Sequence, residues 1–133
     1  MNTTRQQTVI TVKKALEVTH RALNEGEKLG VAVSVTVVDS AMGLVAFAKA
    51  DGATPHSVLS SRRKANTAAS TRRATGFMGE DLALPLPLAT ELQLTNIPGG
   101  APLVFDKAVA GAIGIAGGTP DQDAQIATAA SNT

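Results

Sequence analysis

Two stretches of the sequence alternate apolar and small residues on either side of a turn. The first, VAVSVTVVDSAMGLVAFAKADG, has arms near residues 31–38 and 44–50, around the turn residues DSAMG. The second places APLVFD and AVAGAIGIAG around a turn near Lys107. Such alternation about a short turn is typical of a β-hairpin, and a hairpin forces its two strands to pair antiparallel. The chain is therefore expected to build an antiparallel sheet.

Helix signals precede and follow the first hairpin. Apolar residues recur at helical spacing over residues 9–29, and Gly30 supplies a stop. Thr54 and Pro55 predict an N-cap and a first-turn proline for a second helix that continues through residues 56–74. The side chains on its expected inner face are mostly small, which implies close approach to a sheet or to another helix. They are Val58, Ser61, Ala65, Ala68 and Ala69.

A last helix is predicted over residues 120–130, because Thr119 and Gln122 have the spacing of a capping box. Residues 75–100 contain LPLPL and NIPGG, so we expect a short helix at the start of this segment and an irregular path after it. The order is helix, hairpin, helix, irregular segment, hairpin, helix. It predicts one α+β domain over residues 1–133, with helices packed on an antiparallel sheet.

Composition narrows the range of functions. The formal net charge is +1, and with three Phe and no Tyr or Trp the chain lacks the basic and aromatic surface typical of nucleic-acid binding. The absence of cysteine excludes disulfides and thiolate chemistry. No stretch approaches the length of a membrane span, and the N-terminus has no continuous apolar segment, so a soluble cytoplasmic protein is expected. Its core must be aliphatic.

Two glycine pairs flank the second hairpin. Gly117 and Gly118 lie where a strand gives way to the capping residue Thr119, and Gly99 and Gly100 precede the other arm. Antiparallel pairing places both pairs at the same end of the hairpin. The glycines at 117 and 118 either permit a tight turn or let backbone N–H groups approach an anionic ligand at a helix N-terminus. Both interpretations remain open from the local sequence.

Few side chains offer site chemistry. Within the basic second helix, Lys64 and Arg72 are the cations expected to meet a carboxylate at the sheet edge. His20 lies at the margin of the first apolar stripe and His56 in the first turn of the second helix. Each is either a packed, hydrogen-bonded residue or a ligand for a metal. Neither has a partner at zinc-site spacing.

Three segments together resemble a known family. VAVSVTVVDSAMGLVAFAKADGA, RRKANTAAS and GGAPLVFDKAVAGAIGIAGGTPDQDAQIATAA are similar, in order and spacing, to the GlcG/HbpS family of haem-binding and haem-degrading-type domains, found also as the C-terminal domain of PduO-type proteins. The resemblance implies a profilin-like three-layer fold with a five-stranded antiparallel sheet between helices. It also implies assembly into homo-oligomers, from dimers to octamers. Lys64 and the Gly117-Gly118-Thr119 turn would line the family's pocket.

Two classes of function follow for the chain, beside a purely structural role. The first is a small-ligand-binding protein for haem or a related tetrapyrrole, with His20 or His56 as the iron ligand and Arg or Lys at the propionates. The second is a small cofactorless enzyme, a lyase or isomerase on a hydroxy- or oxo-acid. There Lys64 would carry a proton or anchor a carboxylate, and the amides of the Gly-Gly-Thr turn would hold an oxyanion.

Overall fold

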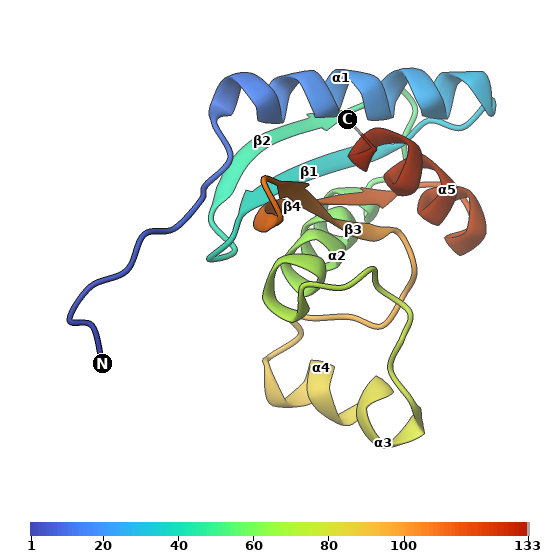
Figure 1. The fold of residues 1–133 in the computed structure, drawn as a ribbon. Coiled ribbons are helices and arrows are strands. Elements are labelled where there is room, and N and C mark those ends of the chain that lie inside the picture. Colours follow the sequence, from blue (N-terminus) through green and yellow to red (C-terminus); the bar gives the residue numbers. More distant parts are fainter. Residues whose placement is uncertain (133) are drawn as a thin grey trace.

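A four-stranded antiparallel sheet forms the centre of the computed structural model, which describes residues 1–132 (Figure 1). The strand order is β2-β1-β4-β3. Both hairpins are confirmed, and β1 joins them by pairing with β4, Ser34 opposite Ala116. The strands are β1 (Ser34–Asp39), β2 (Leu44–Lys49), β3 (Gly100–Phe105) and β4 (Ala108–Ala116).

The predicted α+β class with an antiparallel sheet is confirmed, but the expectation of five strands is wrong for the described residues. The stretch between the second helix and β3 holds Pro85, Pro87 and Pro98, and none of its residues joins the sheet. Proline has no N–H to donate to a ladder, so this stretch does not supply another strand.

Helices cover both faces of the sheet. In Figure 1, α1 and α5 lie on one face and α2 on the other, which matches their contacts. None of the helices within residues 1–132 combines the length and apolar character needed to cross a membrane. The helices are α1 (Val12–Lys28), α2 (Ser57–Thr71), α3 (Glu80–Ala83), α4 (Pro85–Ala89) and α5 (Pro120–Ser131).

Alternate side chains of β1 face the two helix layers. Val35 and Val37 join the aliphatic core beneath α1 and α5. On the other face, the Ser34 hydroxyl lies 2.7 Å from that of Ser57 in α2, and the Thr36 hydroxyl lies 2.7 Å from the hydroxyl of Ser61. All of these side chains are buried, so small hydroxyl pairs fix α2 against the strand.

The helix boundaries differ from the prediction at α2 and agree with it at α5. Helix α2 begins at Ser57 with His56 as its N-cap, because the Ser57 N–H and hydroxyl both donate to the Thr54 carbonyl and close a turn there, at 3.0 and 2.6 Å. Val58, expected on the inner face, is 39% exposed. At α5 the capping box of Thr119 with Gln122 is confirmed.

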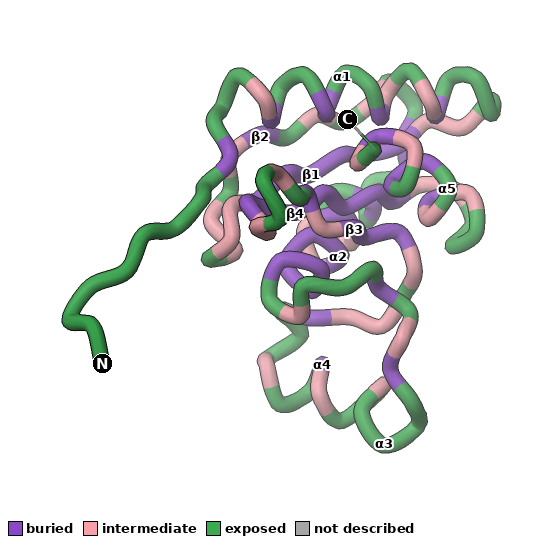
Figure 2. The backbone as a smooth tube through the Cα atoms, in the orientation of Figure 1, coloured by how far each residue is buried: buried purple, intermediate pink, exposed green. Residues whose placement is uncertain are grey.

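Residues 77–98 form an arm that projects from the body of the molecule (Figures 1 and 2). The LPLPL stretch within it, predicted to be irregular, contains helix α4, since a proline in the first turn is compatible with a helix. The arm is anchored on α2 by the Thr95 N–H, which donates to the Thr67 hydroxyl at 2.8 Å. The arm carries several exposed apolar side chains: Leu82, Leu84, Leu88, Leu92 and Ile97.

Candidate functional site

A cavity of about 290 Å³ lies where α2 begins and β4 gives way to α5. We refer to it as the Lys64 cavity. Its lining comes from the start of α2, from the turn after β4 and from the base of the arm. The lining residues are Thr54, His56, Ser60, Lys64, Ile97, Ala116, Gly117, Gly118, Pro120 and Asp123.

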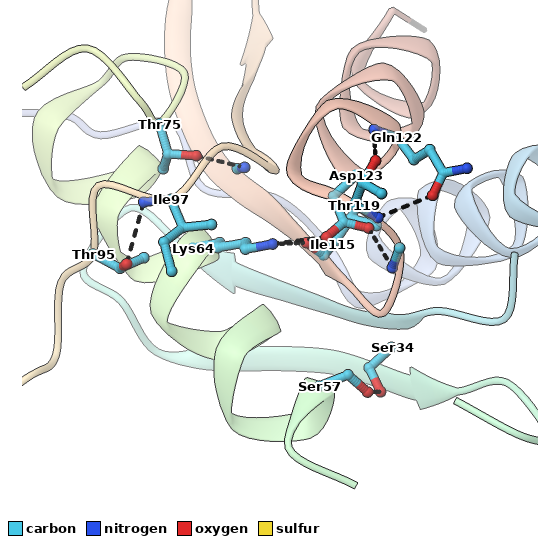
Figure 3. A network of polar contacts seen from close by, with 12 residues as sticks. Ser34, Ser57, Lys64, Thr75, Thr95, Ile97, Ile115, Thr119, Gln122 and Asp123 are labelled. Carbon is cyan, nitrogen blue, oxygen red and sulfur yellow. Dashed lines mark hydrogen bonds and ion pairs between the residues drawn. The ribbon is translucent and has the colours of Figure 1, made fainter. Parts of the chain in front are cut away.

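A buried ion pair forms one wall of the cavity (Figure 3). The Nζ of Lys64 lies 2.9 Å from Oδ2 of Asp123 and donates to the carbonyl of Ile115 at 2.8 Å. The other carboxylate oxygen of Asp123 accepts from the N–H of Gly118 at 2.9 Å. Both side chains are almost completely buried. The pair therefore joins α2, β4 and α5 at a single point.

Asp123 is the site residue that the sequence interpretation missed. It ends the stretch GGTPDQD, in which α5 begins. The available signal was its spacing from Ile126, Ala127 and Ala130, because residues three, four and seven positions apart share one face of a helix. These three are buried, and Asp123 lies on the same inward face.

The glycines serve this ion pair and its turn. Gly117 has φ +130°, and a Cβ there would lie 2.6 Å from the carbonyl oxygen of Ala32. Gly99 has φ +132°, and a Cβ there would lie 2.9 Å from the Nζ of Lys64. Gly100 likewise has no room for a side chain, because its missing Cβ faces the Lys64 carbonyl. Gly99 therefore clears space for the Lys64 side chain, whereas Gly117 allows the turn after β4 to pass close to Ala32.

The amides of the turn are already engaged within the protein. The N–H of Gly118 donates to Asp123, and the N–H of Thr119 donates to Oε1 of Gln122 at 2.9 Å. A backbone donor that is satisfied by a side chain cannot also hold an oxyanion without breaking that bond. The turn as it stands does not offer these two groups to a ligand.

The remaining predicted site residues lie in different places. His56, the N-cap of α2, is exposed and lines the Lys64 cavity. His20 is exposed on α1, in the helix layer on the other face of the sheet. Arg72 is the C-cap of α2, at the far end of that helix, and lines a second cavity. Hence the structure brings His56, but neither His20 nor Arg72, to Lys64. No cluster of three metal-binding side chains occurs within residues 1–132.

The fold and the cavity define a class of protein: an α+β domain with helices on both faces of an antiparallel sheet and a small cavity at one sheet edge, beside a buried Lys–Asp pair. The model of the family described as haem degrading protein HbpS-like matches residues 10–132. The chain belongs to this HbpS-like family, which confirms the resemblance seen in its motifs.

Individual relatives support the assignment. The Escherichia coli K12 protein GlcG is 34% identical over 97 residues, which make up 68% of this chain and 69% of GlcG. A double mutant of Streptomyces reticuli HbpS has a TM-score of 0.86 at 33% identity, covering 96% of this chain and 88% of that one. A PduOC–heme complex has a TM-score of 0.84 at 26% identity, covering 92% and 93% respectively. The likeness therefore extends over the whole fold.

Proposed function

We propose that this protein binds haem at the Lys64 cavity, where His56 would hold the iron. The observation that carries the proposal is an exposed imidazole in the lining of a cavity, in a chain that has no Cys or Tyr to offer iron. When bound, haem supplies an iron that accepts a nitrogen ligand, and histidine is a common protein donor for it. The solved relative PduOC is described as a heme complex, which supports the same ligand here.

The residues around His56 fit part of a porphyrin. Ile97, Ala116 and Pro120 line the cavity with apolar atoms, as a porphyrin face requires. Lys64 uses two N–H groups for Asp123 and Ile115, and an ammonium has three, so one remains for a propionate. At about 290 Å³ the cavity lies at the small end for a ligand pocket, so one chain would cover only part of the ring.

The alternative of a cofactorless lyase or isomerase has weaker support. That function needs Lys64 as a proton carrier and the amides of Gly118 and Thr119 as oxyanion donors. Both amides are bonded to side chains of α5, and Lys64 is held in an ion pair. We therefore favour ligand binding over catalysis.

A hemin titration tests the haem proposal. The wild-type protein is expected to give a saturable shift of the Soret band, and His56→Ala should lose the spectrum of a histidine-bound iron. His20→Ala is the matched control, since it removes the other exposed imidazole and should bind like the wild type. Loss of the signal in His20→Ala alone would indicate that His20 of α1, and not His56, binds the iron. Equal spectra for all three proteins would indicate adsorption without a histidine ligand.

We also propose that the chain forms homo-oligomers through its arm. The arm exposes leucines and carries Glu80, Asp81 and Glu91 but no Lys or Arg. The rest of the chain therefore has 12 cationic against 8 acidic side chains. An apolar, acidic projection on an otherwise basic molecule is complementary in charge to the body of a second copy. Such a contact would also extend the apolar surface that one chain buries.

Sedimentation tests this assembly. At micromolar concentration the wild-type protein should sediment as a dimer or a larger species, up to an octamer. Leu84→Ser combined with Leu88→Ser should shift the profile toward monomer, because these are the most exposed leucines of the arm. Leu29→Ser, at the end of α1, is the control and should leave the profile unchanged. A wild-type protein that sediments only as a monomer would contradict the proposal.

A further inference from the structure

A second cavity, of about 360 Å³, lies at the opposite end of α2 from the Lys64 cavity. Three cationic side chains from three separate parts of the chain line it: Arg5 of the N-terminal segment, Arg72 at the C-cap of α2 and Lys107 in the turn between β3 and β4. We refer to it as the basic cavity. Helix α2 spans about 22 Å, so the two cavities are distinct sites.

The positive charge in the basic cavity is not balanced by ion pairs within residues 1–132. The described part of the chain forms the ion pairs Lys14–Glu17, Lys28–Glu25 and Lys64–Asp123. None of them involves Arg5, Arg72 or Lys107. The carboxylate of Asp39, next in sequence to the lining residue Ser40, accepts from the N–H groups of Ala41 and Gly43 instead. Arg73 stacks 3.9 Å from the Phe77 ring centroid, whereas its neighbour Arg72 faces the cavity.

Two of the three cations occupy backbone conformations that disfavour their own residue type. Arg72 has φ +59° at a helix C-terminus, where glycine is the usual residue. Lys107 has φ +65° in a two-residue hairpin turn, where a sequence such as Asn-Gly would be unstrained. A side chain in this conformation costs free energy, and at these two positions the cost falls on cations that line the cavity. Glycine at either position would relieve the strain but would remove the charge.

The N-terminal segment closes one side of the basic cavity and is held there. The Nε2 of Gln7 donates to the hydroxyl of Ser40 at 2.6 Å, and the Ile10 N–H donates to the carbonyl of Ala110 at 3.0 Å. Ile10 is buried in the main core, which anchors the end of the segment next to α1. The contacts of Gln7 and Ile10 therefore hold the segment that carries Arg5 beside the cavity.

We infer that the basic cavity binds the phosphate group of a small molecule. Guanidinium groups match the oxygens of a phosphate with paired hydrogen bonds, and a lysine adds a point charge. Three converging cations suit a group with more than one negative charge. The volume is within the range for small-ligand pockets and exceeds what a bare phosphate would fill, which favours a phosphorylated metabolite.

Calorimetric titration with pyrophosphate tests the inference. The wild-type protein should bind it, and binding should weaken as salt is added. Arg72→Gly and Lys107→Gly should each lower the affinity about tenfold, the loss of one charge-assisted contact. Their melting temperatures should be unchanged or higher, because glycine relieves the positive φ. Lys13→Gln, which removes an exposed charge of α1, should bind like the wild type.

Other outcomes would overturn the inference. The inference is wrong if the wild-type protein does not bind pyrophosphate at millimolar concentration. It is also wrong if Lys13→Gln loses as much affinity as Arg72→Gly and Lys107→Gly, because binding would then depend on net charge alone. Binding of citrate but not of pyrophosphate would assign the cavity to carboxylates. If Arg72→Gly and Lys107→Gly dissociate oligomers while the wild type ignores pyrophosphate, the cavity holds the acidic arm of a second copy. None of these results depends on haem binding at His56.

Discussion

Lys64→Met should lower the free energy of unfolding by about 3–5 kcal/mol, the loss typical of breaking a buried ion pair from one side. The substitution leaves the carboxylate of Asp123, which is 2% exposed, without its counter-charge. It also removes the donor to the Ile115 carbonyl, which is bonded at 2.8 Å. Urea denaturation followed by circular dichroism measures the change.

Two controls separate the ion pair from other effects. Lys28→Met removes one partner of an exposed pair with Glu25 and should change stability by less than about 1 kcal/mol. The double variant Lys64→Met with Asp123→Leu should recover part of the loss, because it leaves no unpaired charge, but the Ile115 carbonyl and the Gly118 N–H still lose their side-chain partners. A Lys64→Met protein within about 1 kcal/mol of wild type would mean that water or another group satisfies Asp123.

Gly114→Ala should cost about 3 kcal/mol or more, at the upper end for overpacking in a core. A Cβ on Gly114 of β4 would overlap the carbonyl oxygen of Ser61 and approach the backbone N of Ala65 to 2.5 Å, both in α2. These are backbone atoms in the middle of a helix, so neither can rotate away. Thermal unfolding is the measurement.

A second glycine provides the comparison. In Gly79→Ala the new Cβ meets the carboxylate end of Asp81 at 3.1 Å, and an exposed side chain can move. We expect that variant to lose less than about 1 kcal/mol, mainly because glycine is the better N-cap. Equal losses for the two variants would indicate that glycine flexibility, rather than the closeness of α2 to β4, sets the cost.

The elements that were predictable have strong local signals. Both hairpins follow from alternation around short turns, and the start of α5 follows from four consecutive residues of a capping box. The start of α2 was not predictable from Thr54 and Pro55, because the Ser57 hydroxyl competes for the Thr54 carbonyl. The expectation of a fifth strand came from the family resemblance alone, and the sheet of the described residues has four.

The candidate site was predictable only in part. Lys64, His56, Gly99, Gly117 and Gly118 were all singled out from sequence, and the structure places them together. The pairing of Lys64 with a residue 59 positions away depends on how α2 and α5 pack, which no local pattern reports. The position of Arg72 was not predictable for the same reason. A helical wheel shows which face of α2 a residue occupies, but it does not show which end of α2 lies beside the Gly117-Gly118 turn.

The hydroxyl pairs between β1 and α2 have a consequence for how the molecule responds to ligands. Helix α2 carries His56 at one end and Arg72 at the other, and it rests on Gly114 and on the Ser34–Ser57 and Thr36–Ser61 pairs. Sliding or rotating the helix would break these bonds and press side chains into β4. Because α2 can pack on the sheet in one position only, a ligand has no second position of the helix to stabilise. We therefore expect no coupling between the two cavities through movement of α2, so that each cavity binds its own ligand whether or not the other is occupied.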